Sequence, residues 1–143
     1  MPDRQPYRNF NFRVQIDGIA EAQFAEVVVP TASIAVVEYR EGADKTSRTR
    51  KLPGRTSVTN AVLRRGVTTD LSLYQWFRAV SQGEFQPRNT MIVLLDASRQ
   101  DVRRWLLRDA WPVKYEGPTL HAKGNDVAIE SLELACEDVE LEG

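Results

Sequence analysis

Alternation between apolar and polar positions is the main pattern along the chain, and it predicts a mainly β protein. Residues 10–16 (FNFRVQI) alternate strictly, which is typical of a strand with one face toward a core. The turn residues Asp17 and Gly18 follow. Similar runs predict further strands at 24–29, 34–40, 58–65, 91–95, 102–107, 111–115 and 127–139.

The final predicted strand changes phase along its length. Its apolar residues before Glu130 occupy odd-numbered positions, and those from Leu132 to Cys136 occupy even-numbered ones, so the two sets would lie on opposite faces of one regular strand. Because a slip of one residue moves every side chain to the opposite face, we expect a β-bulge or bend near Glu130 and Ser131.

One stretch, Leu71 to Gln82, has helical spacing. Its apolar side chains recur at intervals of three and four residues, as in an amphipathic helix packed on a core. Asp70 is expected to cap its N-terminus, and Gly83 its C-terminus. The fold class is therefore mainly β: an antiparallel β-barrel or sandwich with one flanking helix, forming a single domain over residues 1–143.

A long polar stretch, Arg40 to Ser57, separates two of the predicted strands and is called the arm here. It contains six basic residues against two acidic ones, and Leu52 is almost its only apolar side chain. Loops of this length inside a compact domain are uncommon, and are usually functional or disordered. A solvated surface loop and an arm that becomes ordered against another subunit are both consistent with this composition.

Charge is unevenly distributed, although the 143-residue chain has a net charge of only −1. Residues 130–142 contain six acids and no base. The basic arm and this acidic end are either two solvated patches or complementary surfaces for head-to-tail self-association. In the second interpretation the acidic partner surface consists of Glu130, Glu133, Glu137 and Asp138. A nucleic-acid-binding module would normally have a basic excess, which is absent.

Candidate catalytic chemistry is sparse. His121 is the only histidine, and Cys136, the only cysteine, lies on the apolar parity of a strand. No nucleophile-elbow pattern surrounds Ser57 or Ser131, and a zinc site would need acids as its other ligands. The pairs Arg64-Arg65 and Arg103-Arg104 are more often one solvated and one ion-paired guanidinium than a phosphate clamp. We therefore expect no enzyme activity, no metal and no cofactor.

The sequence shows no long apolar run that would anchor it in a membrane, and its first residues lack the apolar core of a signal peptide. The lone cysteine excludes an intramolecular disulfide. Synthesis and folding in the cytoplasm are expected.

Five segments, in order, resemble the tail tube proteins of contractile-tailed phages and of phage-tail-like contractile injection systems. They are YRNFNFRVQIDGI, VVEYREG, RKLPGRTSVTNAVLRRGVT, RRWLLRDAWPVKYEGP and GNDVAIESLELACE. The resemblance extends from about Tyr7 to Val139. It departs from the family at AEVVVPTAS, where related sequences often have a serine-glycine-leucine turn.

The resemblance implies a structural protein without catalytic residues or cofactor. Family members form hexameric rings that stack into a hollow tube inside a contractile sheath, with baseplate and cap proteins at the ends. The lumen passes DNA in phages and holds protein cargo in injection systems. The particle drives the tube through a target envelope when the sheath contracts.

The resemblance also assigns roles to residues of the arm, which corresponds to an extended family loop that packs against neighbouring subunits. The inter-subunit residues would be Arg40, Lys45, Arg48, Arg50, Lys51, Leu52, Pro53, Gly54 and Arg55. Because the strands that flank the arm carry polar residues on one parity, we expect a lumen-facing set of Glu38, Arg40, Asn60 and Arg64.

Two alternatives share this fold. One is an exported, ring-forming carrier of a type VI-like secretion system. The other is a specialised tube paralogue near the baseplate or cap, which the departure around Pro30 would mark.

Overall fold

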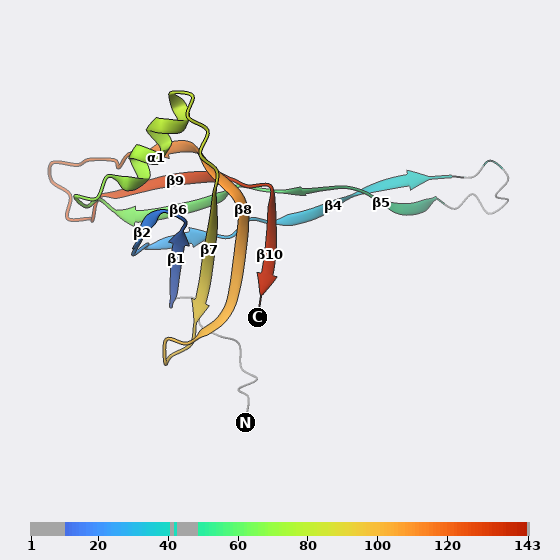
Figure 1. The fold of residues 1–143 in the computed structure, drawn as a ribbon, viewed down its shortest axis with the longest axis horizontal. Helices are drawn as coiled ribbons and strands as arrows, with labels where there is room; N and C mark the ends of the chain where they lie inside the picture. Colours follow the sequence, from blue (N-terminus) through green and yellow to red (C-terminus); the bar gives the residue numbers. More distant parts are fainter. Residues whose placement is uncertain (1–10, 41, 43–48, 143) are drawn as a thin grey trace.

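Antiparallel strands make up most of the computed structural model (Figure 1), which describes residues 11–40, 42 and 49–142, and only the backbone of 20–22. The described elements are, in order, β1 (Phe12–Ile16), β2 (Ile19–Ala22), β3 (Glu26–Val28), β4 (Ala32–Tyr39), β5 (Arg50–Val58), β6 (Ala61–Gly66), α1 (Ser72–Ser81), β7 (Arg88–Leu95), β8 (Asp101–Glu116), β9 (Ile129–Ala135) and β10 (Asp138–Glu142). The expected mainly β fold with one helix is confirmed.

The long strand β8 connects two groups of strands. The sheet runs β2-β1-β7-β8-β9-β6-β3, and β10 pairs with the first half of β8, whereas β9 pairs with the second half. Figure 1 shows β8 curving from the group that contains β1, β7 and β10 into the group that contains β3, β6 and β9. The described strands curl over a core like a sandwich, and they do not close into a barrel.

Irregularities in β8 replace the break that the sequence suggested at residues 108–110. The strands expected at 102–107 and 111–115 are one continuous strand. Asp109 adopts a positive φ of 50°, and the register shifts between Pro112 and Lys114. A long strand can stay paired while it curves because such bulges increase the local twist.

The bulge expected near Glu130 and Ser131 is wrong. β9 pairs with β6 in unbroken register from Leu134 to Ile129, and the chain instead breaks after Ala135, before β10 begins. The apparent change of phase arises because Val127 is 73% exposed and lies outside the core, so its parity carries no information about the buried face.

The helix α1 agrees with the expected range to within one residue at each end. The carboxylate of Asp70 accepts a hydrogen bond from the backbone N–H of Ser72 at 2.9 Å, although the N-cap position itself is Leu71. Gly83 follows the helix with a φ of 95° and donates its N–H to the carbonyl of Val80. This left-handed position favours glycine, so the predicted C-terminal signal is confirmed.

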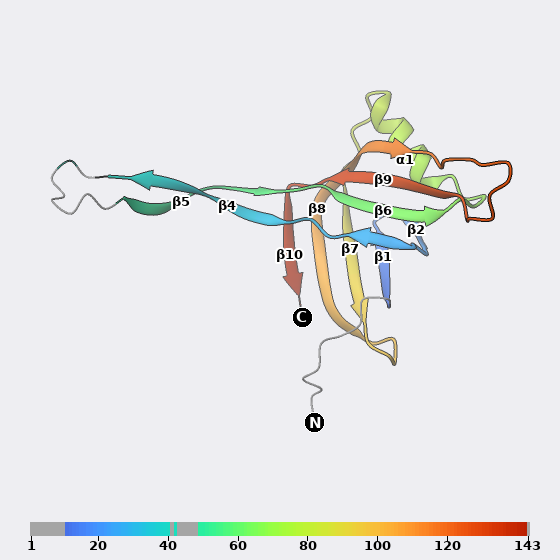
Figure 2. The ribbon, with the colours of Figure 1, turned by 180° about the vertical axis from the view of Figure 1, so that it is seen from behind.

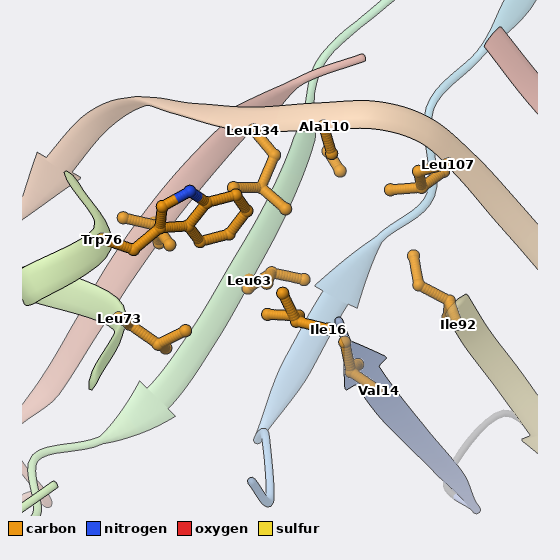
Figure 3. Close-up of a cluster of buried hydrophobic side chains, with 11 residues drawn as sticks. Val14, Ile16, Leu63, Leu73, Trp76, Ile92, Leu107, Ala110 and Leu134 are labelled. Carbon is orange, nitrogen blue, oxygen red and sulfur yellow. The ribbon is translucent and has the colours of Figure 1, made fainter. Parts of the chain in front are cut away.

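The core lies between the helix and the curled sheet (Figure 3). Leu73 and Trp76 of α1 point toward side chains from β6 and β9, and the indole N–H of Trp76 donates to the carbonyl of Gln86 at 2.8 Å. The buried cluster contains Val14, Ile16, Ala61, Leu63, Leu73, Trp76, Ile92, Leu107, Ala110, Leu132 and Leu134. Ala61 and Leu63, at alternate positions of β6, both face this core.

The prediction that residues 40–57 form a loop is wrong for much of that range. Arg50 to Ser57 belong to β5, which pairs with β4 as a separate two-stranded sheet. Figures 1 and 2 show this β4–β5 hairpin projecting far from the rest of the protein. Sequence alternation misses β5 because its side chains are polar on both faces, whereas the cross-strand hydrogen bonds that define it do not depend on side-chain polarity.

Candidate assembly surfaces

The β4–β5 hairpin is exposed on both faces. Every residue of β4 is exposed, as are seven of the nine residues of β5. Its large apolar side chains are about half exposed or more: Ile34, Val36, Val37, Tyr39 and Leu52. A two-stranded hairpin is marginally stable in water on its own, and exposed apolar groups gathered in this way are typical of protein–protein contact surfaces.

A bulge near Pro53 and Gly54 shapes the middle of the hairpin. The register shifts between Ile34 and Val36, where β5 contains one extra residue. A Cβ atom on Gly54 would lie 2.7 Å from Cγ2 of Val37, so glycine allows that side chain to lie against the β5 backbone. Pro53 has no N–H to donate, and proline is tolerated in a strand at an edge or a bulge.

Basic residues occupy the distal half of the hairpin. Arg40, Arg50 and Lys51 are exposed there, and Arg55 is exposed nearer the base. Lys45 and Arg48, also assigned to the arm, lie outside the described residues. In the described part of the chain, no ion pair involves Arg40, Arg50, Lys51 or Arg55.

A groove of about 680 Å³ lies where the hairpin joins the body. Two of the four predicted acids, Glu137 and Asp138, contribute to its wall, and both are exposed. The other lining residues come from the hairpin base: Ala32, Ser33, Ile34, Thr56, Ser57 and Val58. The groove therefore combines apolar surface with negative charge.

The other two predicted acids are engaged within the chain. The side chain of Glu130 is 14% exposed and pairs with Arg65 at 2.9 Å, so its assignment to an exposed acidic surface is corrected. Glu133 accepts a hydrogen bond from the amide of Asn60 at 2.8 Å. Sequence reasoning had placed Asn60 and Glu133 on different surfaces, because it could not see that β6 and β9 are neighbours.

A buried polar network surrounds Arg65, the only charged residue in the described chain that is fully buried. Its guanidinium bonds Glu130, the carboxylate of Asp70 at 3.3 Å and the carbonyl of Asp70 at 2.8 Å. The hydroxyl of Tyr115 donates to the second oxygen of Glu130 at 2.8 Å. This network ties the start of α1 to β6, β8 and β9.

The network shifts two pKa values. The hydrogen bond to Glu130, together with burial, raises the pKa of Tyr115 above its usual value of 10.0. Hydrogen bonding from Ser72, and then from Arg65, lowers the pKa of Asp70. The expectation of one solvated and one ion-paired guanidinium in the Arg64-Arg65 pair is wrong, because both are ion-paired: Arg65 pairs with Glu130 and Asp70, and Arg64, although its side chain is 41% exposed, pairs with Glu26.

The residues expected to face a lumen divide into two groups. Asn60 and Arg64 lie beside the polar outer face of the β3-β6-β9 strands, where they contact Glu133 and Glu26. Glu38 lies on the distal hairpin, opposite Lys51. Within one chain these residues do not form a single patch, and their place in a lumen stays a prediction.

The remaining chemistry is limited. His121 lines a pocket of about 830 Å³ beside the connection from β8 to β9. Burial raises the pKa of the Cys136 thiol, which disfavours the reactive thiolate. Among the described residues, no three His, Cys, Asp or Glu side chains are grouped to hold a metal ion. The described helix is too short and too polar to cross a membrane.

Comparison with solved structures defines the class of protein. A chain of the anti-feeding prophage baseplate, solved with 6-fold symmetry, has a TM-score of 0.85 and 27% identity, covering 99% of this chain and 98% of its own. A chain of the extended sheath-tube complex of an extracellular contractile injection system, PVC, has a TM-score of 0.87 and 24% identity, with coverages of 97% and 93%. A type six secretion system protein has a TM-score of 0.59 and 13% identity, with coverages of 92% and 82%.

The family follows from the sequence itself. The model of the T4-like virus tail tube protein gp19 family matches residues 8–140. The chain belongs to this tail tube family, as the five sequence segments indicated. A comparison of the sequence with curated proteins finds no match.

Proposed function

We propose that this protein is a structural protomer of the inner tube of a contractile injection system or phage tail. Six copies form a ring, rings stack within a contractile sheath, and baseplate and cap proteins close the ends of the tube. The observation that carries the proposal is the tail tube family match over residues 8–140. The likeness to a chain of the 6-fold symmetrised anti-feeding prophage baseplate, at 27% identity, supports two parts of the proposal: membership of a phage-tail-like particle and rings of six copies. The protein has a mechanical role and no catalytic one.

The hairpin supplies the physical reason for assembly. Five of its large apolar side chains are 46–63% exposed in the single chain. Burying what remains exposed would contribute roughly 4–8 kcal/mol, taking about 1.5–3 kcal/mol for each fully buried side chain. A surface of this kind suits a large obligate interface between copies.

A type VI-like exported carrier is the less favoured role. The likeness to the type six secretion system protein has a TM-score of 0.59 and 13% identity, against 0.85 and 27% for the anti-feeding prophage chain. At that identity the likeness supports the fold alone. The fate of the ring, kept in a particle or exported, separates the two roles.

A shortened hairpin tests the proposal. Val37 and Leu52 are cross-strand partners, so a two-residue Asn-Gly turn can join them in place of residues 38–51. We expect wild-type protein to form 6-fold rings and stacked tubes in electron micrographs. The shortened protein should keep its circular dichroism spectrum and thermal unfolding and lose the tubes, because the described core lies outside the hairpin.

A length-preserving variant, Val37→Ser with Leu52→Ser, separates loss of apolar surface from loss of length. It should also stack less than wild type. Full-length tubes from the shortened protein would remove the hairpin from the mechanism. If wild-type protein gave neither rings nor tubes, even with sheath and baseplate proteins added, the tube function would be rejected.

A further inference from the structure

We propose that Asp109 and Asn89 are positioning residues for assembly, because the corner that they form in β8 sets the direction in which the β4–β5 hairpin projects. The inference rests on the proposed function and names residues outside the hairpin that stacking requires. Asp109 has a φ of 50° in the middle of a paired strand. Such a conformation is costly for a residue other than glycine, and it persists where the surrounding structure enforces it.

Asp109 belongs to a bulge between β7 and β8. The register shifts there, so the single residue Asn89 of β7 faces two residues of β8, Arg108 and Asp109. A bulge leaves its extra residue unpaired in the ladder, and the side-chain carbonyl of Asn89 accepts the backbone N–H of Asp109 at 3.0 Å. The backbone carbonyl of Asn89 accepts the N–H of Asp17 at 3.1 Å. Asn89 therefore ties the bulge to the turn after β1.

The strand β8 changes partners at this bulge. Up to Arg108 it pairs with β10, and from Trp111 onward it pairs with β9. The N–H of Glu137, in the break between β9 and β10, donates to the carbonyl of Arg108 at 2.9 Å. Strands that pass from one sheet to another do so at bulges or bends, so Asp109 marks the corner between the two groups of strands.

The hairpin lies beyond this corner from β1, β7 and β10. At its base, the N–H of Thr59 donates to the carbonyl of Thr31 at 3.0 Å, immediately before β6 begins. Figure 1 shows the hairpin continuing the direction of β6 and β9, while β1, β7 and β10 run across it. A change of angle at the corner therefore turns the hairpin relative to β1, β7 and β10.

The length of the hairpin makes assembly sensitive to that angle. The nine residues of β5 extend over roughly 30 Å, at about 3.3 Å per residue. A turn of about 5° at the base moves the far end by roughly 2.6 Å, which is close to the length of a hydrogen bond. The apolar core joins both groups of strands without directional bonds, whereas the hydrogen-bonded bulge has one defined geometry.

Substitution of Asp109 tests this role. Asp109→Val places a β-branched side chain at a positive φ, which it disfavours, so the bulge must change shape. Arg99→Val is the matched control, because Arg99 has a positive φ of 62° in the connection between β7 and β8. Both variants should lose thermal stability, whereas only Asp109→Val should raise the protein concentration needed for stacking, by at least about tenfold. Asp109→Asn tolerates the same φ and should stack like the wild type.

A distance measurement on the unassembled protein separates positioning from folding. Spin labels on Lys51→Cys and Gln100→Cys, both at exposed positions, report the distance from the hairpin to the β7–β8 connection in a Cys136→Ser background. Asp109→Val should shift this distance by about 2–3 Å or broaden its distribution, and Asp109→Asn should leave it unchanged. Asn89→Leu removes the acceptor without altering β8, so it should act in the same direction as Asp109→Val and replaces that variant if it fails to fold.

Unchanged distances in both Asp109→Val and Asn89→Leu would overturn the inference, as would normal tubes from a variant whose distance has shifted. An equal loss of stacking by Arg99→Val would overturn it as well, because lost stability would then be the cause. If wild-type protein forms neither rings nor tubes, the proposed function fails, and the distance measurement still decides whether the corner sets the direction of the hairpin.

Discussion

Arg65 and Arg64 are adjacent in sequence and opposite in environment, so together they test the role assigned to the buried network. The side chain of Arg65 is 5% exposed and that of its partner Glu130 is 14% exposed. The pair of Arg64 with Glu26 is 41% and 57% exposed. We expect Arg65→Met to destabilise the protein strongly and Arg64→Met to have almost no effect.

The magnitude follows from burial. Removing Arg65 leaves the carboxylate of Glu130 in a mostly buried site with the Tyr115 hydroxyl as its remaining partner. Breaking a buried pair from one side costs about 3–5 kcal/mol, whereas an exposed pair contributes about 0–1 kcal/mol. With a urea dependence of about 2 kcal/mol per molar, the midpoint for Arg65→Met should fall by roughly 1.5–2.5 M.

The assay is urea unfolding followed by tryptophan fluorescence and circular dichroism. It should be run at several protein concentrations, because assembly makes apparent stability depend on concentration. A third variant, Arg65→Met with Glu130→Leu, removes both charges. Its stability should return toward that of the wild type, because replacing a buried pair with apolar side chains is often neutral or stabilising.

Two results would refute this reasoning. One is equal shifts for Arg65→Met and Arg64→Met, which would mean that burial does not govern the cost. The other is an additive effect of the Arg65 and Glu130 substitutions, which would mean that the two side chains do not interact.

The remaining predictions concern titration and backbone packing. The folded protein holds the Tyr115 proton more tightly than the unfolded chain, so the resulting stability is present below pH 10.0 and is lost as pH rises through the folded pKa of Tyr115. The variant Tyr115→Phe should therefore show a smaller fall of the urea midpoint above pH 10.0 than the wild type. An equal fall in the two proteins would contradict the assignment of this titration to Tyr115. Gly54→Val should distort the hairpin and reduce stacking, because its Cβ would lie 2.7 Å from Val37 Cγ2, while thermal unfolding of the core should change little. Gly117→Val, where a Cβ meets nothing within 4 Å, is the control, and equal stacking by both variants would refute the packing role.

Short-range patterns determined the elements that have one buried face. Strict alternation identified β1, and spacing by three and four with Gly83 identified α1. These predictions succeed because, in a strand or helix with one buried face, apolar side chains recur with the period of that element. The order of the five segments was enough to indicate the tail tube family.

Only the tertiary structure decided how distant segments pair. β5 is a strand because β4 hydrogen-bonds to it along its length, and the alternation of its side chains gives no sign of this. Glu130 and Glu133 look like members of one acidic surface in the sequence, yet the pairing of β9 with β6 and β8 brings Arg65, Tyr115 and Asn60 to them. Whether a charge is buried and paired depends on neighbours that are close in space and distant along the chain, and local sequence does not specify those neighbours.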